Sequence, residues 1–369
     1  MKRIVSIVLV VGLITALVSC GDNDPDGPES NGDNFDRSTF LSDVADHFII
    51  PEYTKYVSDL TAMDAAANNF ASERTVDAME DLRRSYMTAY LQWQRVSMYN
   101  IGKAEELSIL NFTNIYPTDV EAIEESIEEG SYNLALPSKM DEQGFPALDY
   151  LLYDGPIVDV VTSFSDENRP YATEYLMDNT ARMLSLATQV LDSWNDGYRE
   201  IFIENSGSSA TSSVNKLVND FLFYYEKHLR AGKIAIPAGH FSGSPLVNTV
   251  EGSYSREFSK ALFQSSFDAV REFFNGRSAH TDEITESLQT YLVYLDQNNA
   301  NIAGRINAQF EMTQTAADNV GDDFVQQITA DNIPMLELYQ ELQDNVVIMK
   351  VDMLQALNIK VDFVDADGD

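Results

Sequence analysis

Apolar residues recur at steps of three and four positions along most of the chain. Such stripes cover residues 79–96 and 184–194 in the first half and residues 214–229, 284–295 and 336–357 in the second half. This spacing places side chains on one face of an α-helix, whereas a half-buried strand requires alternation. Long alternating stretches are missing from the sequence. The pattern predicts an all-α fold whose helices bury their apolar faces in a core.

Polar residues near the starts of two helices resemble capping signals. Thr118 is followed three residues later by Glu121, which is the spacing of a capping box. Thr281 is followed by Asp282 and Glu283, and acidic side chains suit the positive end of a helix. We therefore expect helices to begin close to Thr118 and Thr281.

The composition divides the chain into two helix-rich halves. A Gly- and Ser-rich break at residues 205–209 predicts an N-terminal bundle at 37–205 and a C-terminal bundle at 206–369. Each half has about four long helices, which is enough for a four-helix bundle. Residues 111–117 and 231–252 do not follow the helical spacing, and long irregular segments in such folds are often functional.

The N-terminus has the features of a lipoprotein signal. Lys2 and Arg3 precede an uncharged stretch, and small residues lead to Cys20. A run of about 18 or more apolar residues would be needed to span a bilayer, so residues 1–19 are predicted to be a cleavable signal. Cys20 is the single cysteine of the chain, and we expect it to carry the lipid anchor. The alternative is an ordinary secretory signal followed by a chance cysteine.

Residues 20–36 are rich in Asp, Gly, Pro and Asn and have no apolar periodicity. Such a composition favours a flexible tether, because it buries too little surface to offset chain entropy. The acidic start of this segment also resembles a surface-export tag of some Gram-negative lipoproteins. We therefore expect an outer-membrane lipoprotein. It could lie on the cell surface or on the periplasmic face.

The chain has a formal net charge of -35 at pH 7. A protein this acidic is not expected to bind nucleic acid or an anionic membrane surface. Cations, basic partner proteins and neutral ligands remain open, and so does the simpler explanation that the charge keeps a surface protein soluble. With one cysteine, the chain cannot form an internal disulfide or a thiolate metal cluster.

Several segments, in order from about residue 40 to the C-terminus, resemble the imelysin-like family. They are RSYMTAYLQW at 84–93, IYP at 115–117, GFPALDYLL at 144–152, LRAGKIAIPAG at 229–239 and DADGD at 365–369. The resemblance is greatest to lipoprotein members. It implies two helical bundles packed as a pseudo-symmetric pair, with a cleft near their junction. Some members are described as metallopeptidases, and others serve iron uptake or bind metal or acidic polysaccharide.

The hallmark of that family is Gly-x-His-x-x-Glu, and this chain departs from it. The matching positions are Gly144, Pro146 and Asp149. Proline has no lone pair for a metal ion, and it suits the first turn of a helix, where its missing N–H costs nothing. Asp149 is left as a weak candidate ligand for a hard cation or as a hydrogen-bond acceptor. The degenerate motif predicts at most a weakly bound metal and no certain cofactor.

The remaining histidines do not replace the lost ligand. His47, His228, His240 and His280 form no His-Glu-x-x-His pair, and a catalytic zinc commonly needs three protein ligands. We expect His228 to be a hydrogen-bonded residue at a helix end. The C-terminal residues 365–369 imitate the first half of a calcium loop, but a solvated acidic end is the favoured interpretation.

The Gly-rich loop that contains Gly239 follows the cations Arg230 and Lys233. It is the best candidate wall of a binding site. The glycines let backbone approach a ligand, and the cations suit an anionic group such as a carboxylate. The alternative is that the glycines merely turn the chain. In the cleft implied by the family, we expect residues 144–149 to lie near residues 230–241. The candidate ligand contacts, besides Asp149, are Tyr153, Arg230, Lys233, Gly239, His240 and Phe241.

Two classes of function remain open from the sequence. The first is a non-catalytic, lipid-anchored binding protein that serves the uptake of iron or another nutrient, with an uptake-system or surface protein as partner. The second is an imelysin-type metallopeptidase with a remodelled site. The missing histidine favours binding over catalysis. No phosphate-binding loop or serine nucleophile elbow is present to suggest other chemistry.

Overall fold

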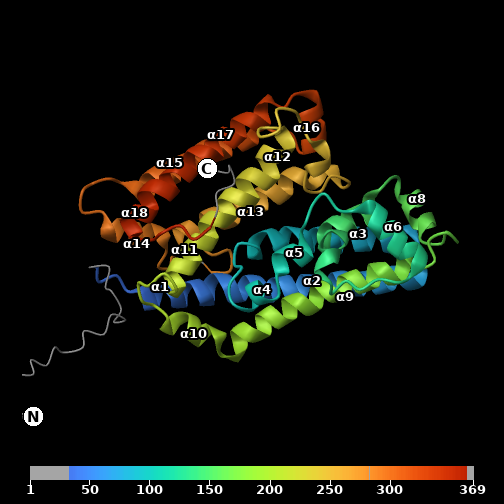
Figure 1. The fold of residues 1–369 in the computed structure, drawn as a ribbon, viewed down its shortest axis with the longest axis horizontal. Coiled ribbons are helices and arrows are strands. Elements are labelled where there is room, and N and C mark those ends of the chain that lie inside the picture. Colours follow the sequence, from blue (N-terminus) through green and yellow to red (C-terminus); the bar gives the residue numbers. More distant parts are fainter. Residues whose placement is uncertain (1–32, 282, 364–369) are drawn as a thin grey trace, which may run out of the picture.

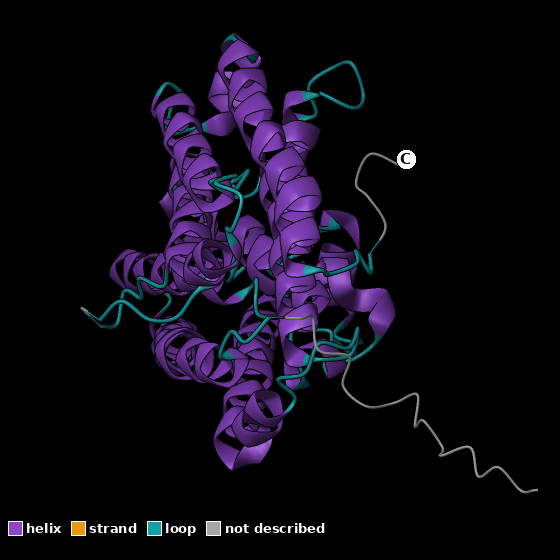
Figure 2. Ribbon diagram, turned by 90° about the vertical axis from the view of Figure 1, so that its left-hand side faces the viewer, coloured by secondary structure: helices purple, strands orange, loops and turns teal. Residues whose placement is uncertain are grey.

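A computed structural model describes residues 33–281 and 283–363. Within these residues the backbone forms helices and loops and no strand, with an isolated bridge between Arg277 and Ile284. The predicted all-α fold is confirmed (Figure 1, Figure 2). In the described part of the chain, no helix is long and apolar enough to cross a bilayer.

The helices of the first half form the lower part of the view in Figure 1. We write α for α-helices and η for 3-10 or π-helical segments. The elements are α1 (Arg37–Val44), η1 (Ala45–Ile49), α2 (Ile50–Glu73), α3 (Val76–Val96), α4 (Lys103–Glu106), α5 (Ile109–Thr113), α6 (Val120–Glu129), η2 (Pro137–Glu142), α7 (Gly144–Tyr153), α8 (Ile157–Ser163), α9 (Ala172–Ser193), η3 (Trp194–Tyr198) and α10 (Arg199–Glu204).

The helices of the second half form the upper part of the same view. They are α11 (Ser213–Phe223), η4 (Tyr224–Ala235), α12 (Ile236–Ala238), η5 (Val247–Thr249), η6 (Arg256–Phe258), α13 (Ser259–Asn275), α14 (Leu288–Leu295), α15 (Ile302–Asp318), α16 (Phe324–Ala330), α17 (Ile333–Val347), η7 (Ile348–Met353) and α18 (Leu354–Leu357).

Long helices pack along one another within each half. In the first half α2 packs against α3 and α9, and in the second half α17 packs against α15 and η4. The halves meet where α13 packs along α3, and their buried apolar side chains form one continuous cluster. The predicted boundary near residue 206 falls in the loop between α10 and α11. Two pseudo-symmetric domains remain a prediction.

Several predicted helix limits are wrong by a few residues. The N-cap of α6 is Asp119, which accepts a hydrogen bond from the Ala122 N–H, and not Thr118. Helix α14 begins only at Leu288, where Ser287 and not Thr281 provides the capping box. Residues 231–238, which were expected to be irregular, continue a helix, because η4 runs into α12 and Gly239 ends it in the left-handed region.

Packed structure reaches back to Asp33, before the first helix. The ring of Phe35 stacks on Tyr291 with centroids 3.9 Å apart, and Asp33 pairs with Arg37 at 2.7 Å. The stacking of Phe35 on Tyr291 ties the end of the expected tether to the second half of the chain. The predicted lipidation site Cys20 and the acidic residues 365–369 lie outside the described residues.

Candidate functional site

A pocket of about 240 Å³ lies beside the degenerate family motif at the junction of the halves. We call it the outer pocket. Its walls come from the segment after α5, from α7 and from the segment between η5 and η6. The lining residues are Tyr116, Pro117, Thr118, Pro146, Asp149, Asn248, Val250, Gly252, Ser253 and Tyr254.

Asp149 stands on α7 and is almost completely buried, with 2% of its surface exposed. Its carboxylate accepts hydrogen bonds from the backbone N–H groups of Tyr254 at 2.9 Å and Ser255 at 3.1 Å. The hydroxyl of Tyr86 on α3 lies 3.3 Å from the same carboxylate. Asp149 therefore joins α7 to a second-half segment that forms one wall of the outer pocket.

Burial raises the pKa of Asp149 to about 6, since removal from water disfavours the charged carboxylate. The hydrogen bonds from Ser255, Tyr254 and Tyr86 act in the opposite direction and offset part of this rise. The group is therefore still mostly ionised at pH 7, and it changes charge in mildly acidic conditions.

This pKa predicts how stability depends on pH. Because the folded state holds the Asp149 proton more tightly than the unfolded state, the stability that the group contributes is complete below its ordinary pKa and is lost as the pH rises through about 6. Relative to Asp149→Asn, the free energy of unfolding of the wild type should fall by about 2 kcal/mol between about pH 4 and pH 7. Urea titrations of both proteins measure this difference, and a rise over that interval would contradict the assignment.

The glycine and proline of the motif have structural reasons to be where they are. Gly144 has φ +78°, and a Cβ there would lie 2.1 Å from the Thr113 carbonyl oxygen. Its N–H donates to Asn179 Oδ1 at 2.9 Å. Pro146 is buried in the first turn of α7, where an N–H has no partner within the helix.

The residues at the motif do not fit a metal ion. Pro146 supplies no ligand, and the Asp149 carboxylate is already engaged by Tyr254 and Ser255. Across residues 33–281 and 283–363, no three His, Cys, Asp or Glu side chains come together in a way that could hold a metal. A zinc ion at the motif would therefore lack the three protein ligands that a catalytic zinc commonly needs.

Behind the outer pocket, a buried ion pair joins Lys233 on η4 to Glu251. Each side chain is 4% exposed. Lys233 also donates to Gln94 Oε1 on α3 at 2.7 Å, and Gln94 donates to Glu251 at 2.9 Å. Asn114 donates to Glu251 at 2.7 Å. The network thus links both halves through their core.

The two charges of this network stabilise each other. Burial lowers the pKa of Lys233, and the neighbouring Glu251 carboxylate opposes that decrease. Burial alone would raise the pKa of Glu251, but Lys233, together with Asn114 and Gln94, holds it below its ordinary value. The ion pair therefore favours the charged form of both groups against the effect of burial, and each group depends on the other.

Tyr116 lines both the outer pocket and a small inner cavity. The inner cavity, about 20 Å³, is lined by Trp93, Gln94, Ser97, Leu110, Asn114, Tyr116, Tyr224, His228 and Lys233. The Tyr116 hydroxyl would lie 3.2 Å from a Cβ at Gly232, so the glycine gives the ring room against η4. His228 lies inside η4 with its ring stacked on Tyr224 and not at a helix end, contrary to expectation.

The other expected ligand contacts point into the second half. Arg230 is fully buried and donates to Gln343 and, at 3.2 Å, to the Tyr339 hydroxyl on α17. The exposed ring of His240 lies 3.8 Å from that of Tyr339, and Phe241 packs beside it. Neither Arg230 nor His240 lines the outer pocket or the inner cavity.

Two further candidates are placed differently. Gly239 turns the chain with φ +77°, and a Cβ there would lie 2.3 Å from the Ser244 backbone, so its glycine serves the turn. Tyr153 lies under the guanidinium of Arg83 and beside Tyr86, one contact away from Asp149. A ligand role for these residues remains a prediction, while Asp149 is the candidate that lines the outer pocket.

Sequence reasoning missed Glu251, Gln94, Asn114 and Tyr116. Tyr116 belongs to the IYP segment, and Glu251 lies in the irregular segment 231–252, so both lay within regions of interest. Gln94 is part of a helical stripe and carries no visible signal. Only the packing of α3 against the second half shows that these side chains meet.

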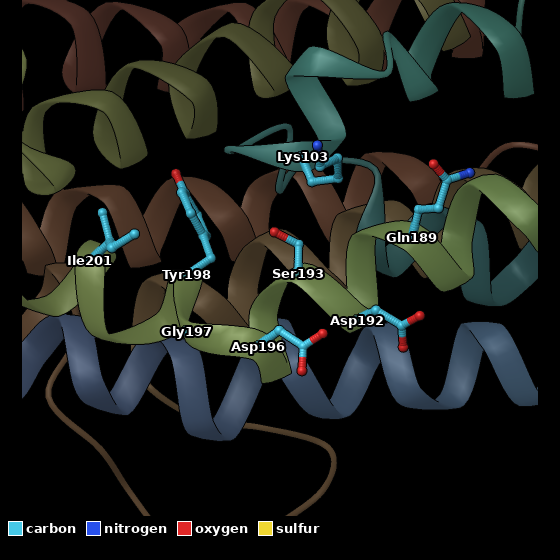
Figure 3. A pocket seen from close by; sticks show the side chains of 8 residues that line it. All are labelled: Lys103, Gln189, Asp192, Ser193, Asp196, Gly197, Tyr198 and Ile201. Carbon is cyan, nitrogen blue, oxygen red and sulfur yellow. The ribbon is translucent and has the colours of Figure 1, made fainter.

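A larger and more open pocket of about 490 Å³ lies elsewhere, between α4 and the kinked end of α9 (Figure 3). Gln189 and Tyr198 extend from the helix on the side where Lys103 lies, while the carboxylates of Asp192 and Asp196 lie on the other side. Gly197, with φ +108°, forms the kink. This pocket shares no lining residue with the outer pocket, and its acidic groups do not converge, so size alone does not make it the site.

The sequence of this all-helical chain matches a known family. The imelysin family model, of peptidase family M75, matches residues 49–348, and the chain therefore belongs to the imelysin family. No curated protein matches the chain.

Two solved structures share the fold. An imelysin-like protein from Psychrobacter arcticum 273-4 has a TM-score of 0.68 at 17% identity, covering 89% of this chain and 97% of its own. A putative iron-regulated protein A precursor from Parabacteroides distasonis ATCC 8503 has a TM-score of 0.72 at 19% identity, covering 89% and 96%. At these identities the likeness concerns the fold.

Proposed function

We propose that this protein is a lipid-anchored, non-catalytic binding protein of the cell envelope that takes up a small ligand in the outer pocket. The observation that carries the proposal is the pocket itself: it lies over the family motif, and Pro146 stands at the motif's histidine position. A site without that histidine retains walls for binding but lacks a metal ligand set for hydrolysis.

A role in iron-related or other nutrient uptake is consistent with the printed name of the Parabacteroides distasonis structure, a putative iron-regulated protein. An uptake-system or surface protein would then receive the ligand. An outer-membrane location, with the folded part outside the cytoplasm, follows from the signal and Cys20.

Metabolic labelling tests the anchor. A radiolabelled or clickable fatty acid should mark the wild type and not the Cys20→Ala variant, because the thiol is the attachment point. Equal labelling of both proteins would contradict a lipid on Cys20.

The competing function is a metallopeptidase with a remodelled site, which the family's name favours. Casein degradation by the purified protein, with and without a chelator, separates the two functions. A binding protein gives no chelator-sensitive cleavage. Cleavage that disappears with chelator and with Asp149→Asn would favour the peptidase.

A further inference from the structure

We propose that the outer pocket selects a small organic ammonium ligand, that is, a positively charged alkylamine group of a few carbons. This inference rests on the proposed function, since it assumes that the outer pocket is the ligand site. It goes beyond that function by naming the chemistry of the ligand, and it differs from the anionic ligand expected from the sequence.

The charge of the pocket is the first argument. Asp149 is the one charged residue among its ten lining residues, and the other polar groups there are neutral side chains such as Thr118 and Asn248. The carboxylate is removed from water, where a charge acts more strongly than at the surface. The negative net charge of the chain adds to this field. The pocket therefore attracts cations and repels anions.

The two cations that the sequence predicted as ligand contacts do not offset the negative charge of the outer pocket, because each pairs with a carboxylate outside it. Lys233 is paired with Glu251 and lines the inner cavity. Arg230 forms an ion pair with Glu226 at 3.5 Å and donates to Gln343. Neither side chain lines the outer pocket, so an anionic ligand would meet a carboxylate without a compensating cation.

The walls of the pocket favour an organic cation over a hydrated metal ion. Tyr116 and Tyr254 supply aromatic rings, and Pro117, Pro146 and Val250 supply apolar surface. Aromatic rings attract cations through their negative faces, and rings together with apolar surface suit the carbon shell of an alkylammonium group. A metal ion would instead need several oxygen or nitrogen ligands. The volume of about 240 Å³ is suited to a ligand of a few carbons.

Cysteine labelling tests this selectivity without knowledge of the natural ligand. In the full chain carrying Cys20→Ala, Ser253→Cys places the only thiol on the pocket wall, and Ser209→Cys places one on an exposed loop as reference. Each is reacted with a cationic trimethylammonium-ethyl and an anionic sulfonatoethyl methanethiosulfonate. The reference removes the effect of the chain's overall charge.

The ratio of cationic to anionic rates at Ser253→Cys should exceed the reference ratio by about tenfold, which corresponds to about 1.4 kcal/mol. It should fall to the reference ratio when Asp149→Asn is added, with the helical circular dichroism unchanged. Tyr254→Phe should keep the preference, and Tyr254→Leu should reduce it, because the ring is lost. Tetramethylammonium should slow labelling of Ser253→Cys by a neutral reagent.

The contrary outcomes separate the two proposals. A ratio equal to or below the reference, in a pocket that still reacts and is protected by an anion such as acetate, would overturn the ammonium ligand and leave the pocket as a binding site. Protection by Ca²⁺ and not by tetramethylammonium would assign a metal ion instead. No reaction with either reagent, and no protection by any ion, would contradict the pocket as a ligand site and so the proposed function.

Discussion

Replacing Lys233 with methionine should lower the free energy of unfolding by about 3 to 5 kcal/mol, the usual cost of leaving a buried charge without its partner. The variant would leave Glu251, which is 4% exposed, with hydrogen bonds from Gln94 and Asn114 and no cation. Lys233 also donates to Gln94 on α3, so its loss weakens the contact between the halves. Urea unfolding followed by circular dichroism measures the effect.

A matched control is the exposed pair of Lys216 and Glu105, whose side chains are 48% and 57% exposed. Lys216→Met should change stability by less than about 1 kcal/mol, because surface ion pairs contribute little. The double variant Lys233→Met, Glu251→Met should be less destabilised than the sum of the single variants, since no charge is left unpaired. Equal effects of Lys233→Met and Lys216→Met would contradict the buried pair.

Gly144→Ala should be the second most damaging change, with a loss of about 2 to 5 kcal/mol. Part of the loss is the cost of about 1 to 2 kcal/mol for an L-residue in the left-handed region, since Gly144 has φ +78°. The rest comes from the new Cβ, which would meet the Thr113 carbonyl at 2.1 Å and force α5 and α7 apart. The thermal midpoint and the urea midpoint should both decrease.

Gly155→Ala separates the backbone cost from the cost of the close contact. Gly155 also has a positive φ, +115°, but a Cβ there would meet nothing within 4 Å. This variant should lose only the backbone cost of about 1 to 2 kcal/mol. If Gly144→Ala lowered the free energy of unfolding no more than Gly155→Ala does, the result would contradict the close contact between α5 and the motif.

The fold was largely predictable because helical periodicity depends on local spacing. The stripe at 79–96 lies in α3, and the stripe at 336–357 runs through α17, η7 and α18. The predicted helix limits were wrong where tertiary contacts decide them. Ile284, for example, is 64% exposed and forms a bridge with Arg277, so the apolar stripe begins before the helix does.

The candidate site was only partly predictable. Asp149 was found because the family motif marks its position, and the structure places it on the pocket wall. The directions of Arg230 and Lys233 were not predictable from α-helical spacing, because η4 is π-helical for twelve residues and turns side chains by a different angle per residue. Lys233 thus meets Glu251, while Arg230 meets α17.

The central claim is that this imelysin-family site binds without a resident metal. Its most direct test is the metal content of the purified wild type and of Asp149→Asn by mass spectrometry, after both are loaded with zinc or iron and dialysed. We predict well below one metal ion per chain, with no difference between the two proteins. One ion per chain in the wild type, lost in Asp149→Asn, would contradict the claim.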